Sequence, residues 1–147
     1  VQAQTLIERD QLKGNRRGTG MILSAARSWL YNLVVAERIR RDSWSTAMEF
    51  ETQPCAPLWG RGRSSAGGDL AELEKQILAD WQSWCYALEH AGLKQERRAI
   101  VLVPDALQWQ RLGPDQLELS FGLTTGGFAT AVLREIAELF RPQIQAL

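Results

Sequence analysis

The chain has 147 residues, of which 45% are hydrophobic and six are tryptophan, enough apolar material for one domain or part of one. Its formal net charge is zero and its pI is near 6.8, so the overall balance does not by itself indicate nucleic-acid binding. The two cysteines and the single histidine form no metal or redox motif, and no signal peptide or membrane-length apolar run is present. We therefore expect a soluble, cytoplasmic protein with no metal site.

The charges are unevenly distributed along the chain. Residues 9–41 hold eight basic residues against two acids, whereas residues 69–89 hold five acids against one lysine. Fourteen of the seventeen basic residues are arginine, whose planar guanidinium suits phosphate binding and base stacking better than lysine does. A GC-rich genome also favours arginine, so composition leaves both explanations open. The pattern predicts one basic face and one acidic face.

The N-terminal third is expected to be mainly helical. Residues 1–11 could form a short helix, residues 13–20 read as a basic loop, and residues 22–41 have the period of an amphipathic helix. Around that helix Arg27 and Arg38 lie about 20° apart, so they could line one groove.

Residues 42–68 read as a loop-rich stretch, with two prolines and a run of glycine, serine and arginine at its end. This run is flexible and carries Arg61 and Arg63. It either follows RNA phosphates or is a solvated linker, and composition alone does not separate the two.

A second amphipathic helix is expected from Asp69 to His90. Asp69 followed by Glu72 resembles a capping box, and Gly92 fits a C-terminal cap. The apolar face of this helix contains two tryptophans that we expect to be core anchors and a cysteine that we expect to be a buried thiol: Trp81, Trp84 and Cys85.

Three strands are expected next, over residues 99–103, 107–111 and 116–123. Arg97 and Arg98 precede the first of them, and a Gly-Pro-Asp turn at residues 113–115 separates the last two. Helices followed by a run of strands indicate an α+β domain, with helices packed on one face of an antiparallel sheet.

The last strand leads into a helix through Gly126 and Gly127. A glycine pair between a strand and a helix lets the backbone approach a ligand closely, although it is also what a plain turn requires. The helix has apolar residues at helical period from Ala129 to Phe140 and is expected to end before Pro142.

Four groups of residues, taken together and in this order, carry a family resemblance. They are Leu23-Ser24-Ala25-Ala26-Arg27-Ser28 with Asn32 and Ala36-Glu37-Arg38; Pro57-Leu58-Trp59-Gly60-Arg61-Gly62-Arg63 with Ala66-Gly67-Gly68; Glu96-Arg97-Arg98-Ala99; and Gly127-Phe128-Ala129-Thr130-Ala131-Val132-Leu133-Arg134-Glu135. No single group is decisive, but four in the same order are hard to obtain by chance. From about residue 22 to residue 139 the sequence resembles the TruD family of tRNA pseudouridine synthases.

The resemblance implies the C-terminal part of the pseudouridine synthase fold, an antiparallel or mixed sheet flanked by helices. It also implies the family's chemistry, in which an aspartate attacks, the bond between uracil and ribose breaks, the base rotates, and C5 becomes bonded to C1′. The implied substrate is a uridine in the D-arm region of tRNA, which must first be flipped out of the folded RNA. No cofactor and no metal are implied.

The family pattern assigns roles to two sets of residues. The first set would line the uracil pocket, with Leu133 as an apolar wall and Arg134 paired with the nucleophile or a phosphate: Gly127, Phe128, Ala129, Thr130, Leu133 and Arg134. The second set would bind RNA or brace the active-site cleft: Arg27, Asn32, Arg38, Arg61, Arg63, Arg97 and Arg98. Core packing is the alternative for Phe128 and Leu133, and a buried salt bridge with Glu37 or Glu135 is the alternative for one of the helical arginines.

The family's nucleophile has no counterpart in this sequence. It lies in a Gly-x-Lys-Asp motif, and no aspartate of this chain follows a lysine. We therefore expect the chain alone to be inactive and to need the N-terminal half of the same enzyme as a partner, with tRNA as substrate. The alternatives are a non-catalytic RNA-binding module derived from the family, and a structural fragment whose exposed apolar edge marks where the absent half docks.

The organisation of the chain raises the question of completeness. Only residues 42–56 separate the first helix from Pro57, fewer than the family leads us to expect, and the sequence begins at Val1 rather than at a methionine. Either a segment has been lost or the sequence is part of a longer polypeptide. We expect a basic N-terminal segment over residues 1–21, followed by the C-terminal portion of the synthase domain over residues 22–147.

Overall fold

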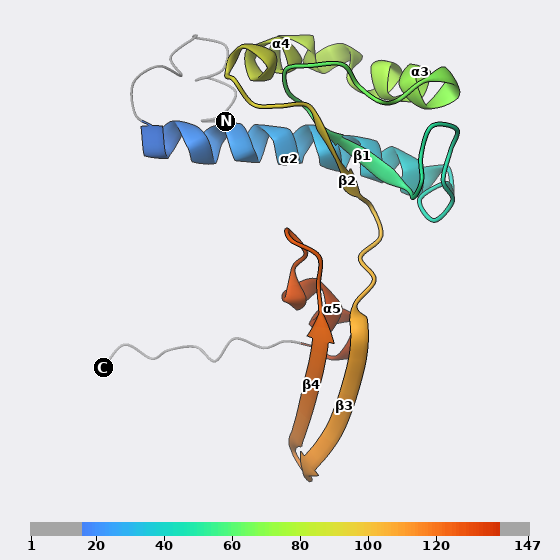
Figure 1. Ribbon diagram of the computed structural model, residues 1–147, viewed down its shortest axis with the longest axis vertical. Coiled ribbons are helices and arrows are strands. Elements are labelled where there is room, and N and C mark those ends of the chain that lie inside the picture. The colour runs from blue at the N-terminus through green and yellow to red at the C-terminus, as the bar shows by residue number, and fades with distance from the viewer. Residues whose placement is uncertain (1–15, 139–147) are drawn as a thin grey trace. The chain divides into compact units, whose positions relative to one another are not determined.

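The computed structural model describes residues 16–138, with side chains from residue 20 onward. The described residues form two compact units, one ending at Val101 and one beginning at Leu102 (Figure 1). The helix predicted for residues 1–11 lies outside the described residues.

The first unit is built on α2 (Arg16–Arg40), a helix of 25 residues. It begins before residue 22, so the prediction of a loop over residues 13–20 is wrong from Arg16 onward. A helix of this length is stabilised mainly by the core that it covers, which outweighs the cost of the two glycines in its first turns, Gly18 and Gly20. Its buried side chains recur at helical spacing and include one charged residue: Leu23, Ala26, Leu30, Val34 and Arg38.

A short antiparallel ladder contacts α2. It consists of β1 (Cys55–Leu58) and β2 (Glu96–Ala99), with Pro57 opposite Arg97 and Ala56 opposite Arg98. The prediction of an uninterrupted loop over residues 42–68 is therefore wrong at β1, where a proline in a four-residue strand hid the signal.

The position of β2 also differs from the prediction. The apolar run indicated a strand over residues 99–103, but the ladder begins three residues earlier and ends at Ala99. Pairing with β1 determines where β2 lies, because β1 has only four residues and they pair with Glu96–Ala99. Arg97 and Arg98 are consequently strand residues, and their polarity is compensated by partners described below.

The predicted second helix is divided into α3 (Gly68–Ile77), a 3₁₀ turn η1 (Ala79–Trp81) and α4 (Gln82–His90). The break occurs at Leu78, where the backbone has φ −93° and ψ 8°. The Leu78 carbonyl accepts hydrogen bonds from the Trp81 N–H at 3.0 Å and from Gln82 Nε2 at 3.0 Å. The Gln82 side chain thus replaces the backbone donor that a continuous helix would supply.

The predicted capping box at the start of α3 is wrong, whereas the predicted C-terminal cap of α4 is confirmed. The N-cap residue is Gly67 and no side chain caps it, because the helix begins before Asp69 and places that carboxylate inside the first turn. At the other end Gly92 follows the helix with φ 81°, the left-handed conformation typical of this position.

The core of the first unit lies between α2, the ladder and α4. Trp84 and Cys85 are buried in it, and the rings of Trp81 and Trp84 meet edge to face with centroids 5.0 Å apart. Burial, followed by the nearby charge of Glu89, raises the pKa of the Cys85 thiol to about 12. These side chains confirm the predicted core anchors and the buried thiol. The buried members of the core are Leu23, Ala26, Leu30, Val34, Ala56, Leu78, Trp84, Cys85 and Leu88.

The second unit contains a β-hairpin and a short helix. β3 (Asp105–Gly113) pairs antiparallel with β4 (Gln116–Gly122), and the predicted Gly-Pro-Asp turn connects them. The pairing is irregular near the start of β3, where Ala106 has φ 47°, consistent with one extra residue in that strand. The helix α5 (Ala129–Ile136) follows the glycine pair as predicted, but its predicted extension to Phe140 is wrong, because the backbone is already extended at Ala137 with φ −151° and ψ 150°.

The α+β class is confirmed, with one modification. The described residues form two separate two-stranded antiparallel ladders, β1–β2 and β3–β4, where the sequence indicated one sheet of three strands. Within residues 16–138 no helix is both long enough and apolar enough to cross a membrane.

Gly60 gives a direct test of how closely the chain packs after β1. A Cβ atom at this position would lie 2.6 Å from the backbone oxygens of Leu93 and Lys94, and a backbone cannot yield as a side-chain end can. We predict that Gly60→Ala lowers the free energy of unfolding by roughly 1–3 kcal/mol. Urea denaturation of the chain measures the change.

The matched control is Gly20→Ala, which places a Cβ in α2 with nothing within 4 Å. Helix propensity alone should make this variant more stable by about 0.5–1 kcal/mol. Equal stability of the Gly60→Ala variant and the unaltered chain would contradict the packing described here.

Candidate functional site

The residues predicted to bind RNA or brace a cleft all lie in the first unit, and burial divides them into two groups. The largely buried group is Arg27, Arg38 and Arg97. The exposed or half-buried group is Asn32, Arg61, Arg63 and Arg98.

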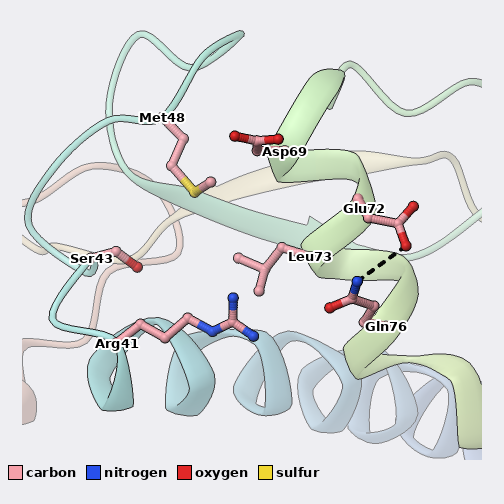
Figure 2. A pocket seen from close by; sticks show the side chains of 7 residues that line it. All are labelled: Arg41, Ser43, Met48, Asp69, Glu72, Leu73 and Gln76. Atoms are coloured by element: carbon pink, nitrogen blue, oxygen red, sulfur yellow. Dashed lines mark hydrogen bonds between the residues drawn. The ribbon is translucent and has the colours of Figure 1, made fainter.

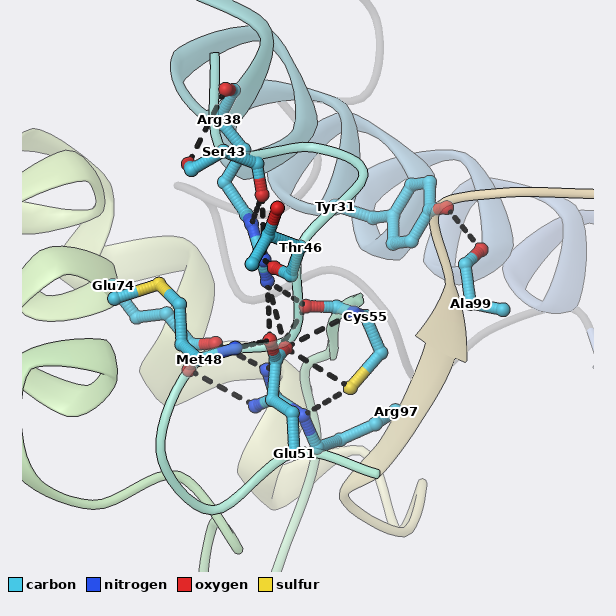
Figure 3. A network of polar contacts seen from close by, with 10 residues as sticks. All are labelled: Tyr31, Arg38, Ser43, Thr46, Met48, Glu51, Cys55, Glu74, Arg97 and Ala99. Atoms are coloured by element: carbon cyan, nitrogen blue, oxygen red, sulfur yellow. Dashed lines mark hydrogen bonds and ion pairs between the residues drawn. The ribbon is translucent and has the colours of Figure 1, made fainter. Parts of the chain in front are cut away.

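Arg38 is the centre of a buried polar network between α2, the loop that follows it and β1 (Figure 3). Its Nη1 donates to both carboxylate oxygens of Glu51, at 2.7 and 2.8 Å, and neither side chain is exposed. Nε and Nη2 donate to the Ser43 carbonyl at 3.2 and 2.8 Å, and Nη2 also donates to the Thr46 carbonyl at 2.7 Å. With its donors occupied inside the unit, Arg38 braces the fold and is not available to an RNA phosphate.

Glu51 is held by more than the guanidinium. Its carboxylate also accepts hydrogen bonds from the backbone N–H groups of Met48, at 2.9 Å, and Cys55, at 3.0 Å. Burial by itself raises the pKa of the Glu51 carboxyl. The hydrogen bonds from Arg38, Met48 and Cys55 outweigh burial and hold that pKa below its usual range.

Arg97 connects β2 to α3 through a second ion pair of the same network. Its Nη2 and Nη1 donate to the two carboxylate oxygens of Glu74 at 2.6 and 3.2 Å, a bidentate arrangement. Nη2 also lies 3.4 Å from Glu51, so the two ion pairs are joined. Burial raises the pKa of the Glu74 carboxyl even though Arg97 opposes the change.

Cys55 lies inside this network. Its Sγ accepts a hydrogen bond from Arg97 Nε at 3.0 Å and lies 3.3 Å from Glu51 Oε1. Burial is the main cause of a raised pKa for the Cys55 thiol, against the opposing effect of Arg97. The thiol is therefore held in its neutral form and donates to Glu51.

Arg27 joins α2 to the ladder at the other end of β1. Its Nη2 donates to the backbone carbonyls of Leu58 at 2.9 Å and Lys94 at 2.7 Å, and lies 3.4 Å from the Glu96 carboxylate. Arg27 and Arg38 both contact the ladder, but each has its own set of partners. They do not line one shared groove, because eleven positions along a helix separate them by roughly 16 Å.

The other residues predicted to bind RNA are at least partly accessible to solvent. Arg61 and Arg63 are exposed in the loop after β1, and Asn32 is exposed on α2. The Arg98 guanidinium lies 5.8 Å from the centre of the Tyr31 ring, whose hydroxyl donates to the Ala99 carbonyl at 2.7 Å. Burial is the main cause of a raised pKa for the Tyr31 hydroxyl. These exposed side chains are the ones that could reach a phosphate.

The buried salt bridge anticipated for one arginine is found at Arg38, with Glu51 as its partner rather than Glu37 or Glu135. Glu37 instead pairs at the surface with Arg40 at 2.6 Å and Arg41 at 2.7 Å. Hydrogen bonds from these two guanidinium groups lower the pKa of the Glu37 carboxyl to about 2.

Sequence reasoning missed Glu51 and Glu74. Glu74 could have been found, because it lies four residues after Leu70 and three before Ile77, on the apolar side of its helix. A charged residue in that position requires a buried partner. Glu51 lies in a loop and carries no comparable signal.

The residues predicted to line the uracil pocket belong to the second unit. The Gly127 N–H donates to the Thr124 carbonyl at 2.9 Å, and Gly126 has φ 88°, so the glycine pair forms a tight turn. A Cβ atom on Gly127 would lie 2.9 Å from Leu102 Cδ1 and 3.1 Å from the Thr124 oxygen. Local packing therefore requires a glycine here whether or not a ligand binds.

After this turn most of the predicted pocket residues face solvent. Phe128 is 66% exposed and Leu133 is half-buried. Val132 is the buried residue of α5. Core packing within the second unit consequently does not account for Phe128. The exposed members of the set are Phe128, Ala129, Thr130 and Arg134.

A cavity that the sequence did not indicate lies between α3, the end of α2 and the loop after it (Figure 2). It has a volume of about 380 Å³, with Leu73 and Met48 as apolar lining, and it is also lined by Arg41, whose Nε donates to Glu37 at 2.7 Å. Glu72 accepts a hydrogen bond from Gln76 across its wall at 3.2 Å. Its full lining is Arg41, Ser43, Met48, Asp69, Glu72, Leu73 and Gln76. In the described part of the chain, no three His, Cys, Asp or Glu side chains are placed to hold a metal ion.

The buried network requires the negative charge of Glu51 opposite Arg38. Glu51→Gln keeps the shape of the side chain but leaves the buried Arg38 guanidinium without an opposite charge. We predict that this substitution lowers the free energy of unfolding by roughly 3–5 kcal/mol, because an unpaired buried charge is strongly destabilising. The control is Glu49→Gln in the same loop, where the residue is exposed and a change within about 0.5 kcal/mol is expected. Urea denaturation of both variants separates the two cases.

The same carboxylate should make stability depend on pH. The pKa of Glu51 is lower in the folded state, so its contribution is present above the unfolded pKa of about 4.3 and is lost as pH falls through the folded value. Glu74 has the opposite sign, since its raised pKa gives a contribution that is lost as pH rises. We predict that the unfolding free energy of Glu51→Gln falls less steeply than that of the unaltered chain below about pH 4.3. Parallel slopes in denaturation series at several pH values would contradict this assignment.

Comparison with known proteins identifies the family to which the chain is similar. A model of the family described as tRNA pseudouridine synthase D (TruD) matches residues 43–136. The tRNA pseudouridine synthase D of Cellvibrio japonicus (strain Ueda107) is 42% identical over 149 residues, covering 99% of this chain and 44% of the relative. The protein of the same name from Nitrosococcus oceani is 37% identical, covering 80% of this chain and 41% of the relative.

The chain spans less than half the length of the curated relatives that it matches. On the family match and on the identity to the Cellvibrio japonicus protein, the chain belongs to the TruD family of tRNA pseudouridine synthases.

Proposed function

We propose that this chain supplies the C-terminal part of a tRNA pseudouridine synthase, with the catalytic aspartate outside its sequence. The observation that carries the proposal is the 42% identity to a tRNA pseudouridine synthase D along 99% of this chain. Residues 22–147 would form the C-terminal portion of the synthase domain, preceded by a basic segment over residues 1–21. A cytoplasmic location accords with tRNA as the substrate.

The proposed reaction isomerises a uridine of tRNA. As the aspartate attacks, the bond between uracil N1 and ribose C1′ breaks with its electron pair on the base, and the base rotates. C5 then bonds to C1′ as the carboxylate leaves, the C5 hydrogen departs as a proton, and N1 takes up a proton. No redox step occurs, and no cofactor or metal is required. The role of this chain is to position the base and the RNA backbone, since it supplies no aspartate in the family's motif.

The turn and helix of the second unit are proposed to form one wall of the uracil pocket. Gly127 allows the close turn, Phe128 and Leu133 offer apolar surface, and Arg134 offers a guanidinium to the nucleophile or a phosphate. The support is accessibility, because Phe128 and Arg134 are exposed on an ordered turn and helix. Ala129 and Thr130 complete this wall.

The arginines of the first unit are proposed to divide into two roles. Arg61, Arg63 and Arg98, together with Asn32, would contact RNA, because their side chains reach the surface. Arg27, Arg38 and Arg97 would hold the ladder and α2 in the shape that presents those contacts. Such contacts make binding sensitive to salt, since each phosphate that is neutralised releases counterions.

The hairpin of the second unit is proposed to pack against the part of the enzyme that this chain lacks. Trp109 lies opposite Leu119 and Arg111 lies opposite Leu117, so these side chains share one face. Trp109 is 70% exposed and Leu117 is 53% exposed. A two-stranded hairpin is marginally stable alone, and a face of this kind normally requires a cover.

Substitution in the hairpin tests this contact. We predict that Trp109→Ser weakens association with a second polypeptide, one comprising the family sequence that this chain does not span, by at least about tenfold. The control is Gln108→Ser on the opposite face, which should leave association within about twofold. Calorimetric titration measures both, and equal effects of the two substitutions would rule out the apolar face as the contact.

The proposed activity is tested by tritium release from a tRNA transcript labelled at uridine C5. We expect no release above background with this chain alone, and release when the complementary polypeptide with its aspartate motif is added. Arg134→Ala should slow release roughly 100-fold, as expected for the loss of one charged group in an active site. Gln110→Ala, on the hairpin face away from Trp109, is the control and should change the rate only a few-fold.

Each result has one meaning. Release by this chain alone would show that another carboxylate acts as nucleophile. The absence of release after complementation, with tRNA binding intact, would favour the non-catalytic RNA-binding module.

A further inference from the structure

A cavity at the C-terminal end of α4 has a composition that differs from the rest of the surface. It has a volume of about 370 Å³ and is lined by Arg61, Gly62, Glu89, His90 and Gly92. Arg61 is the only one of these residues that belongs to the predicted RNA-binding set. The cavity therefore brings an exposed guanidinium together with an imidazole and a carboxylate from a distant part of the sequence.

Two exposed aromatic rings extend from the cavity along α4. The rings of Tyr86 and His90 are stacked, with centroids 4.0 Å apart and an interplanar angle of 29°. Tyr86 is 64% exposed. Unlike Trp81 and Trp84, which pack in or against the core, this pair presents aromatic surface to solvent. An exposed aromatic surface beside an arginine is the arrangement on which unpaired RNA bases stack.

The orientation of the imidazole can be assigned from its hydrogen bond. His90 Nδ1 lies 2.8 Å from the Tyr86 carbonyl oxygen, and a carbonyl can only accept, so Nδ1 carries the hydrogen. Nε2 is therefore an acceptor in the neutral ring and a donor in the protonated ring. The neutral ring can accept a hydrogen bond from a base N–H, and only the protonated ring can donate one to a phosphate oxygen.

Two residues of the cavity wall are glycines, which place no side chain in the cavity. Gly62 has φ 129° and Gly92 has φ 81°, conformations that side-chain-bearing residues rarely adopt. A Cβ atom on Gly92 would meet nothing within 4 Å, so the space beside it is open. A flat group could approach the backbone here without displacing a side chain.

The charges in the cavity fit a nucleotide better than a free phosphate. Arg61 supplies a cation, but the Glu89 carboxylate, which accepts a hydrogen bond from Trp59 Nε1 at 2.9 Å, would repel an isolated anion. A ribose hydroxyl or a base N–H is a donor that a carboxylate accepts.

We propose that this cavity and the Tyr86–His90 pair bind one unpaired nucleotide of the tRNA substrate. The base stacks on the aromatic pair, its phosphate lies against Arg61, and its 2′-hydroxyl or a base N–H donates to Glu89. The proposal rests on the proposed function, because it takes tRNA to be the RNA that the chain meets.

The test is a measurement of the equilibrium binding of the full chain to an unmodified tRNA transcript. Fluorescence anisotropy monitors the binding at several salt concentrations. Tyr86→Ala should weaken binding by about 5- to 100-fold, which corresponds to the loss of one stacked base. Tyr86→Phe keeps the ring and should bind within about twofold of the unaltered chain. Trp44→Ala removes another exposed aromatic residue that does not line this cavity and serves as the matched control.

Salt dependence separates the two contacts. Arg61→Ala should reduce the slope of log K against log salt by about one, because one phosphate contact is lost. Tyr86→Ala should leave that slope unchanged while lowering affinity at every salt concentration. Circular dichroism confirms that each variant is folded, which is expected because both side chains are exposed.

The outcomes distinguish this proposal from the one on which it rests. Binding by the unaltered chain with no loss in Tyr86→Ala would overturn the nucleotide site and leave the proposed function standing. Failure of the unaltered chain to bind tRNA would contradict RNA binding by this part of the enzyme, and the nucleotide site with it. Equal losses in Tyr86→Ala and Trp44→Ala would show that the effect is not specific to this cavity, and would also overturn it.

Discussion

The ion pair between Arg38 and Glu51 is the interaction on which the first unit depends. It joins the end of α2 to the loop that leads into β1, with both side chains removed from solvent. Through the 3.4 Å contact of Glu51 with Arg97 it extends to Glu74 on α3, so one network connects two helices and the ladder. Desolvating these charges is costly, and an apolar core could provide equal stability. What the network adds is specificity, because only one arrangement of these elements satisfies all of its donors and acceptors.

This arrangement divides the arginines of the first unit between buried and exposed environments. Acidic partners occupy Arg38 and Arg97, and Arg27 is bound mainly to backbone carbonyls. The side chains left at the surface include Arg61 and Arg63. Net charge alone therefore does not show which guanidinium groups are accessible, since Arg27, Arg38 and Arg97 are used within the fold.

Features set by local periodicity could be predicted from the sequence, and features set by distant partners could not. The amphipathic face of α2, the hairpin turn after Gly113 and the cap at Gly92 all follow from residues close in sequence. The division of the second helix at Leu78 depends on a side-chain hydrogen bond from Gln82, and the position of β2 depends on which residues β1 can pair with. Whether an arginine is buried depends on acids such as Glu51 and Glu74, which helical or strand periodicity in its own segment does not reveal. For the candidate site, residue types could be assigned from the family pattern, but accessibility required the structure.

Two adjacent arginines in β2 would allow the ladder to pair in a second register, shifted by one residue. If the ladder slipped by one residue, Arg98 would take the place of Arg97 and could satisfy the same carboxylates, so the ion pairs alone do not define the alignment. Three uncharged contacts do define it: the Tyr31 hydroxyl meets the Ala99 carbonyl, the Gly60 N–H meets Gln95 Oε1, and Gly60 fits against the backbone of Leu93 and Lys94. In the slipped ladder each of these would face the wrong residue. The charged network thus holds the ladder to the helices. Tyr31, Gln95 and Gly60 determine which of the two nearly equivalent registers the ladder adopts.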